Sequence, residues 1–321
     1  MSTPVPARPD ALTGSPDASR PGLFPRLAAE GFGSLILAVT GLGVPLFSIP
    51  QSSPMPAALA AGLAVTAAML AFGHVSGGHF NPAITLGHLL AGRIRAGAAA
   101  AYVAAQLAGA SLGALALYAV LRTLPGIADS RTAFDTVTAG FGEHSIVQAP
   151  LAAVLLLEVI GAAIIVSVFL GAAARGRANS AAAPVAVGLT FAALLQLGQA
   201  VGNLPFNPAR AAASAFFSSG WALEQLWVFL AAPLAGAAVA GLVFRTFRAG
   251  EQAGEHAVPA SGPGAETGGS TGSDVSDVSD VSDDEGDAAP VAAPTGGVAV
   301  SRKDSDGGAS EAQEFFEGKR G

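Results

Sequence analysis

The amino-acid sequence predicts an all-α membrane protein with six transmembrane helices and two half-spanning re-entrant helices, built as an inverted repeat. Three observations predict this fold: six long apolar stretches, a duplication of the chain, and two Asn-Pro-Ala breaks at matching places in the copies. The composition agrees. Of 321 residues, 51% are hydrophobic and 12% charged, and the mean hydropathy of +0.52 is too high for a soluble domain.

Each of the six apolar stretches has roughly the 20 residues that a helix needs to cross a bilayer. They lie near 27–49, 55–74, 97–121, 149–174, 182–200 and 222–247. All are rich in Ala, Gly, Leu and Val, and small residues suit close helix packing in lipid.

The arginines beside these stretches predict the orientation. If the helices alternate, one side of the membrane receives Arg26, Arg93, Arg95, Arg175, Arg177, Arg245 and Arg248. The other side receives only Arg122 and Arg131, apart from Arg210 inside a break. The positive-inside rule therefore predicts a multi-pass protein of the inner (plasma) membrane with both termini in the cytoplasm.

The ends of the chain differ from its centre. We expect a disordered arm over 1–25, a membrane domain over 26–249 and a disordered acidic tail over 250–321. The tail has 15 acidic and 4 basic residues, so the net charge of −7 arises there. A regulatory role for the tail, through phosphorylation of Ser282, stays open. There is no cysteine, which excludes disulfides and cysteine-ligated metals. No cofactor and no nucleic-acid partner are expected.

The two halves repeat each other. Glu30 matches Glu158, Gln106 matches Pro233, and the Asn-Pro-Ala triplets match, at separations of 128, 127 and 126 residues. The copies cover about 26–122 and 148–248. Each copy holds three spans, so the second must enter the membrane from the opposite face.

The two breaks read HVSGGHFNPAIT (74–85) and NLPFNPAR (203–210). Asn is a good helix N-cap and Pro is favoured at the first helical position. Each triplet opens a helix of 11 residues, about 16 Å long, or roughly half of the hydrocarbon thickness. Two such helices from opposite faces would meet N-terminus to N-terminus in the centre of the bilayer.

That meeting point predicts a site for small hydrogen-bonding solutes. It joins two positive helix-dipole ends and the side chains of Asn81 and Asn207. The run Gly77, Gly78 and His79 would line one wall with backbone carbonyls, because irregular backbone at this depth must be buried or face a wet cavity. The dipoles and Arg210 would oppose cations. A water that accepts from both asparagines turns its hydrogens outward, which interrupts a proton relay.

These motifs resemble those of the aquaporin (major intrinsic protein) superfamily. Further segments similar to bacterial aquaporins are AEGFGS (29–34), AYVAAQLAGA (101–110), GFGEHS (140–145) and GWALEQLW (220–227). The resemblance implies a passive channel for water or small uncharged solutes, a homotetramer, and a pore in each subunit. It identifies the paired boxes as Asn81, Pro82, Ala83, Asn207, Pro208 and Ala209.

The family's spacing places a second constriction, the selectivity filter, on Ala61, Leu195, Leu204 and Arg210. Water-selective relatives usually carry Phe and His at the first two places, and glycerol facilitators carry Trp and Gly. Only the arginine is kept here. The departure predicts a wider and more apolar filter that passes water and larger neutral solutes.

Other interpretations compete for the polar residues. Arg210 could extend to a membrane surface, although its place inside a half-helix favours the pore. His74 and His79 could bind a metal, but with no carboxylate nearby a structural role is favoured. Glu30 and Glu158 could move protons; we expect them instead to hold the backbone of the opposite re-entrant loop. An ion- or proton-coupled transporter would need those carboxylates at the midplane. An enzyme would need a nucleophile and base, for which only Ser76 with a histidine is available.

Overall fold

The computed structural model describes residues 21–48, 55–174 and 181–256. The expected arm and tail therefore lie outside the described residues, apart from 21–25 and 250–256, as do Arg175, Arg177 and Ser282. Every regular element in the described part of the chain is a helix.

Six helices are long and apolar enough to span a membrane, which confirms the predicted set. They are α1 (Leu23–Phe47), α2 (Ala57–Ser76), α4 (Ala96–Leu121), α6 (Leu151–Ala174), α7 (Ala182–Gly202) and α9 (Gly220–His256). Two expected boundaries were wrong. α1 begins inside the predicted arm, and α9 continues as a helix beyond residue 249.

Two short helices follow the Asn-Pro-Ala breaks, α3 (Pro82–Leu90) and α8 (Pro208–Ala215); they have 9 and 8 residues and are shorter than the 11 predicted. The order α1, α2, α3, α4 is thus repeated as α6, α7, α8, α9. Each half-helix packs against the last helix of the other copy, α3 on α9 and α8 on α4. The two copies are therefore interlocked around the half-helices.

The two copies also meet where α2 packs on α7. Gly62 and Gly188, which are 126 residues apart and so equivalent in the repeat, face each other there. A Cβ on either glycine would meet the backbone oxygen of the other. Close backbone contact between small residues is how helices associate in lipid, where burial of apolar side chains gives little driving force.

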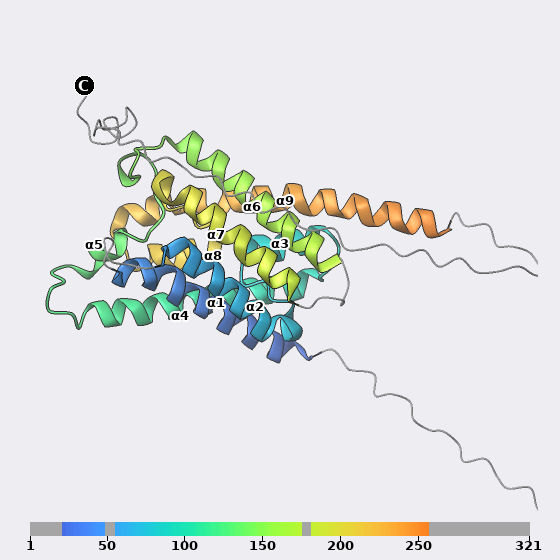
Figure 1. Ribbon diagram of the computed structural model, residues 1–321, viewed down its shortest axis with the longest axis horizontal. Helices are drawn as coiled ribbons and strands as arrows, with labels where there is room; N and C mark the ends of the chain where they lie inside the picture. The colour runs from blue at the N-terminus through green and yellow to red at the C-terminus, as the bar shows by residue number, and fades with distance from the viewer. Residues whose placement is uncertain (1–20, 49–54, 175–180, 257–321) are drawn as a thin grey trace, which may run out of the picture. The chain divides into compact units, whose positions relative to one another are not determined.

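The connection from α4 to α6 holds two further short helices, α5 (Ser130–Asp135) and η1 (Gly142–His144). It lies at the end of the bundle opposite the beginning of α1 and the end of α9 (Figure 1). We call these two ends the α5 side and the terminal side. The Arg131 guanidinium donates to the Ser218 carbonyl at 2.7 Å, and Asp135 accepts from the backbone N–H and hydroxyl of Ser219. The connection is thus fastened to the beginning of α9.

Candidate functional site

The two half-helices begin at asparagines that cap them. Asn81 has extended backbone, and its Oδ1 accepts from the Ala83 N–H at 2.8 Å. Asn207 caps α8 in the same way, accepting from Ala209 at 3.0 Å and Arg210 at 3.3 Å. Both side chains are nearly inaccessible to solvent. Each cap satisfies N–H groups that would otherwise lack a partner at a helix start.

The same two side chains bind across the repeat. The Asn81 amide Nδ2 donates to the Phe206 carbonyl at 2.9 Å, and the Asn207 Nδ2 donates to the Phe80 carbonyl at 3.1 Å. Two half-helices from the two copies are thus joined at their N-termini by a crossed pair of hydrogen bonds. A side-chain amide has two N–H donors, so each asparagine keeps a second one.

The residues before the asparagines were not singled out by the sequence. Phe80 and Phe206 both adopt positive φ, 50° and 49°, and both rings are fully buried. Any Cβ at Gly33 would clash with the ring of Phe80, and one at Gly161 would clash with Phe206. Each ring therefore occupies the space left by a glycine on the first helix of its own copy, which anchors the strained turn.

Glu30 holds the first break by four hydrogen bonds. Its Oε1 accepts from the Ser76 hydroxyl at 2.6 Å and the His79 N–H at 3.0 Å. Its Oε2 accepts from the Phe80 N–H and the Gln106 amide, both at 2.7 Å. We expected Glu30 and Glu158 each to hold the loop of the opposite copy, and that was wrong for both. The Glu30 carboxylate holds the loop of its own copy, because α1 packs beside the end of α2.

Glu158 has the same place in the second copy but far fewer partners. Its Oε1 accepts only from the Phe206 N–H, at 3.1 Å, and its Oε2 is buried without a partner among the described residues. The positions that match Ser76, His79 and Gln106 are Gly202, Pro205 and Pro233. None of these three can supply the donor that its counterpart in the first copy supplies.

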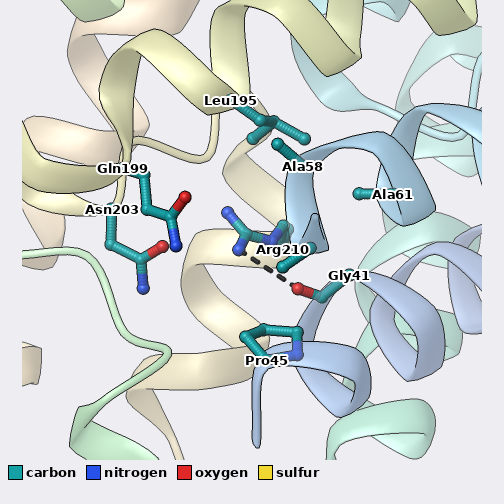
Figure 2. A pocket seen from close by; sticks show the side chains of 9 residues that line it. Gly41, Pro45, Ala58, Ala61, Leu195, Gln199, Asn203 and Arg210 are labelled. Atoms are coloured by element: carbon teal, nitrogen blue, oxygen red, sulfur yellow. Dashed lines mark hydrogen bonds between the residues drawn. The ribbon is translucent and has the colours of Figure 1, made fainter. Parts of the chain in front are cut away.

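The predicted filter surrounds a small pocket on the α5 side of the asparagines. Ala61, Leu195 and Arg210 line it together with Gly41 (Figure 2). The Arg210 Nη2 donates to the Gly41 carbonyl at 3.4 Å, whereas its Nε is buried and unpaired among the described residues. A Cβ at Gly41 would lie 3.6 Å from that Nε and 3.8 Å from the Ala61 Cβ. Gly41 therefore opens space beside the guanidinium.

Leu204 was predicted to line the filter, and its side chain does not. Asn203 ends α7 in a left-handed conformation, with φ 51°. The Leu204 N–H then donates to the Gly198 carbonyl at 3.2 Å, and its side chain packs against Gly198 in the core. Pro205, the next residue, lines the pocket instead.

The filter was also expected to be wide, whereas the spaces found at it are small. The pocket beside Arg210 and the next one toward Asn207 each have a volume of about 20 Å³. This is room for about one water molecule. Leu37, Val65 and Phe191 cause the narrowing, because they lie one helical turn from Gly41, Ala61 and Leu195 and line the inner pocket. Ala61 and Leu195 give the filter apolar side chains, and the polar Gln199 and Asn203 line the same pocket.

Wider cavities lie at both ends of α2 and α7. One of about 410 Å³ lies beyond the filter and is lined by residues such as Ser48, Pro56 and Gln196. One of about 470 Å³ lies on the terminal side, lined in part by Gly73, Gly77 and Phe169. Two larger cavities thus lie at the two ends of α2 and α7, and the single-water spaces lie beside Arg210 and Asn207.

The first break reaches the terminal-side cavity. Gly77 lines the cavity, while Gly78 and His79 are buried behind it. The His79 ring contacts the Thr85 hydroxyl at 3.1 Å and lies with its centroid 4.1 Å from the His88 ring. His74 lines the cavity separately. The sequence analysis did not single out His88. It follows His79 by nine residues and lies in the last turn of α3.

The chain is similar in sequence to a known family and to known proteins. Residues 18–244 match the family called major intrinsic protein. An Aquaporin Z of Photorhabdus laumondii subsp. laumondii is 37% identical over 236 residues, which are 71% of this chain and 99% of that protein. An Aquaporin Z of Bradyrhizobium diazoefficiens is 37% identical over 224 residues, 68% of this chain and 92% of that protein.

Among solved structures, the aquaglyceroporin from Plasmodium falciparum has a similar fold. The TM-score is 0.56 at 20% sequence identity, and the match covers 70% of this chain and 95% of that one.

Proposed function

This chain belongs to the major intrinsic protein family and is a passive membrane channel for water or small uncharged solutes, and from that premise we propose that water is its principal permeant. The size of the constriction carries this proposal. Two successive spaces of about 20 Å³ each admit a molecule the size of water, and cavities of about 410 and 470 Å³ lie at the two ends of α2 and α7.

The crossed asparagines support exclusion of protons. Each amide donates one N–H to the opposite loop and has a second N–H, and Asn207 lines the inner pocket. A water that accepts from both free N–H groups points its own hydrogens away from its neighbours on each side. A chain of waters oriented in opposite directions from the centre cannot relay a proton through it.

Arg210 supports exclusion of cations. Its guanidinium lies at the single-water space, and the N-termini of α3 and α8 add positive partial charge near the centre. A cation must also lose its hydration to enter a space of this volume, which is costly beside a fixed positive charge.

A coupled transporter is the alternative, and the position of the carboxylates argues against it. Glu30 and Glu158 are both fully buried, and the oxygens that have partners hold the backbone of the breaks. Neither of them lines the filter pockets or the two wide cavities.

The test is stopped-flow light scattering of proteoliposomes under an osmotic gradient. We expect water permeability well above that of empty liposomes, little flux of glycerol or urea, and no change on adding a protonophore. Glycerol flux equal to water flux would contradict the narrow filter. Flux that collapses with the protonophore would favour the transporter.

We also propose a homotetramer with a pore in each subunit, and both termini in the cytoplasm of a plasma-membrane protein. Exposed apolar side chains on the spans, such as Phe32, Leu112 and Val239, support burial of the outer surface in lipid or against other subunits. Arg26 on α1 and Arg245 on α9 support the orientation. Crosslinking and cysteine labelling from either side would test these two proposals.

A further inference from the structure

Two polar side chains on the α5 side of the filter are not used in the mechanism above. Gln199 and Asn203 line the same small pocket as Arg210, and Figure 2 shows both on one side of the guanidinium. Gln199 lies four residues after Leu195, so it occupies the same face of α7 one turn farther out. Asn203 directly precedes Leu204. Each amide thus lies just outside a filter position that is apolar in this chain.

The polar atoms around this pocket are largely unpaired. Gln199 is exposed, and no described residue forms a hydrogen bond with its amide. Asn203 donates through Nδ2 to the Thr138 carbonyl at the long distance of 3.5 Å, and its Oδ1 has no donor among the described residues. The Arg210 Nε is also unpaired within that part of the chain. The buried, unpaired Arg210 Nε and the amides of Gln199 and Asn203 therefore leave donors and acceptors beside a space for one water.

The other wall of the pocket is apolar. It consists of Pro45, Ala57, Ala58 and Ala61. Deeper in the pore, the inner pocket is lined by apolar side chains from three helices: Leu37, Val65, Phe191 and Leu195. A molecule that enters that pocket from the α5 side gives up hydrogen bonds to bulk water before it reaches the asparagines.

We propose that Gln199 and Asn203, together with Arg210, form an outer ring that binds one uncharged, water-sized molecule carrying both a donor and an acceptor. This inference rests on the proposed function, because it identifies how that permeant is received. Two amides offer donors and acceptors, and the guanidinium offers donors only. The ring replaces lost hydrogen bonds one turn before the apolar constriction. Leu195 and Leu204 are apolar and cannot make polar contacts, and the ring supplies such contacts instead.

The test compares isosteric variants in proteoliposomes by stopped-flow water permeability. Gln199→Met keeps the length of the side chain and removes its amide. We expect water permeability to fall about fivefold, as for the loss of one hydrogen bond. Asn203→Gly keeps the left-handed backbone at φ 51° and removes the second amide, with a similar loss expected. Gln196→Met is the matched control, since Gln196 is exposed on the same helix but does not line the small pocket.

A rescue separates binding from a general disturbance of the pore mouth. In the Gln199→Met background, Leu195→His returns a polar group to the constriction, and we expect at least half of the lost permeability to recover. Water permeability that is unchanged in both Gln199→Met and Asn203→Gly would overturn the inference, as would equal losses in Gln199→Met and Gln196→Met, or no recovery. A wild-type protein without water flux would instead contradict the proposed function.

Discussion

Glu30 and Glu158 have equivalent positions in the two copies, yet one carboxylate accepts four hydrogen bonds and the other accepts one. Hydrogen bonds to a charged acceptor contribute more than those between neutral groups. The first break is therefore held much more firmly by its glutamate than the second. Phe206 depends correspondingly more on its contact with Gly161.

This difference predicts unequal effects of the same substitution. Glu30→Gln places an NH₂ group against donors that now bind an oxygen, and we expect a loss of about 3 kcal/mol in stability. Glu158→Gln can place its NH₂ where Oε2 has no partner among the described residues, so we expect a loss of about 1 kcal/mol or less. Thermal unfolding in detergent, followed by circular dichroism, measures both. Equal shifts in Tm would refute the difference.

Motifs in the sequence predicted the asparagine caps, the arginine and the apolar wall. They wrongly placed the Leu204 side chain in the filter, because the left-handed turn at Asn203 directs the next side chain into the core. They did not predict the small inner space either, since Leu37 on α1 and Phe191 on α7 come to line one pocket only in the folded bundle. Spacing along a chain identifies which residues are near a site, but backbone torsions decide which side chains enter it.

Among the elements, the helices themselves followed from length and hydropathy. What the pattern could not give was the extent of α9, whose sequence past Phe247 contains glycines and charges and yet continues as a helix to His256. The contact between α2 and α7 was also not predicted, because it depends on the match of two glycines 126 residues apart.

That contact gives a prediction for helix packing. Gly62→Ala places a Cβ against the Gly188 carbonyl and Ala192, and overpacking of this kind costs about 1–3 kcal/mol. Gly97→Ala on α4 is the control, since no atom lies within 4 Å of its Cβ position and alanine is the better helix former. We expect a lower Tm for the first variant and an equal or higher Tm for the second. A stable Gly62→Ala protein would show that α2 and α7 can separate without loss.

The fastening of the α4–α6 connection gives a second prediction at this scale. Asp135→Ala removes both bonds to Ser219 at the beginning of α9, which are 2.8 and 2.6 Å long. We expect faster hydrogen exchange in the first turn of α9. Asp129→Ala removes a cap that serves only α5, through Arg131 and Thr132, and should leave α9 unchanged. Identical exchange of α9 in both variants would contradict the fastening.

In the molecule as a whole, the volume of the cavities varies greatly from the ends of the bundle to its centre. Two cavities of about 410 and 470 Å³ are separated by spaces of about 20 Å³. The rate of passage should depend on side chains at the small spaces and only weakly on those at the mouths.

A glycine-to-leucine substitution, made once at a small space and once at a large cavity, tests this expectation. Gly41→Leu fills the space beside Arg210, and we expect water permeability to fall more than about tenfold, because a single-water passage has no alternative route. Gly73→Leu projects into the terminal-side cavity, where no atom lies within 4 Å of the Cβ position, and should keep most of the flux. Osmotic swelling of proteoliposomes distinguishes the two. Similar losses would mean that the cavities are not the wide mouths of one conduit.

The crossed hydrogen bonds between the asparagines and the phenylalanine carbonyls also affect how the protein is made. When only the first copy has been synthesised, the Asn81 amide cannot yet donate to the Phe206 carbonyl. The Phe80 carbonyl likewise lacks its donor, Asn207, which comes 127 residues later in the chain. The conducting centre is therefore completed only after the second copy has been inserted. A chain interrupted halfway holds an unfinished break in the bilayer rather than half of a working pore.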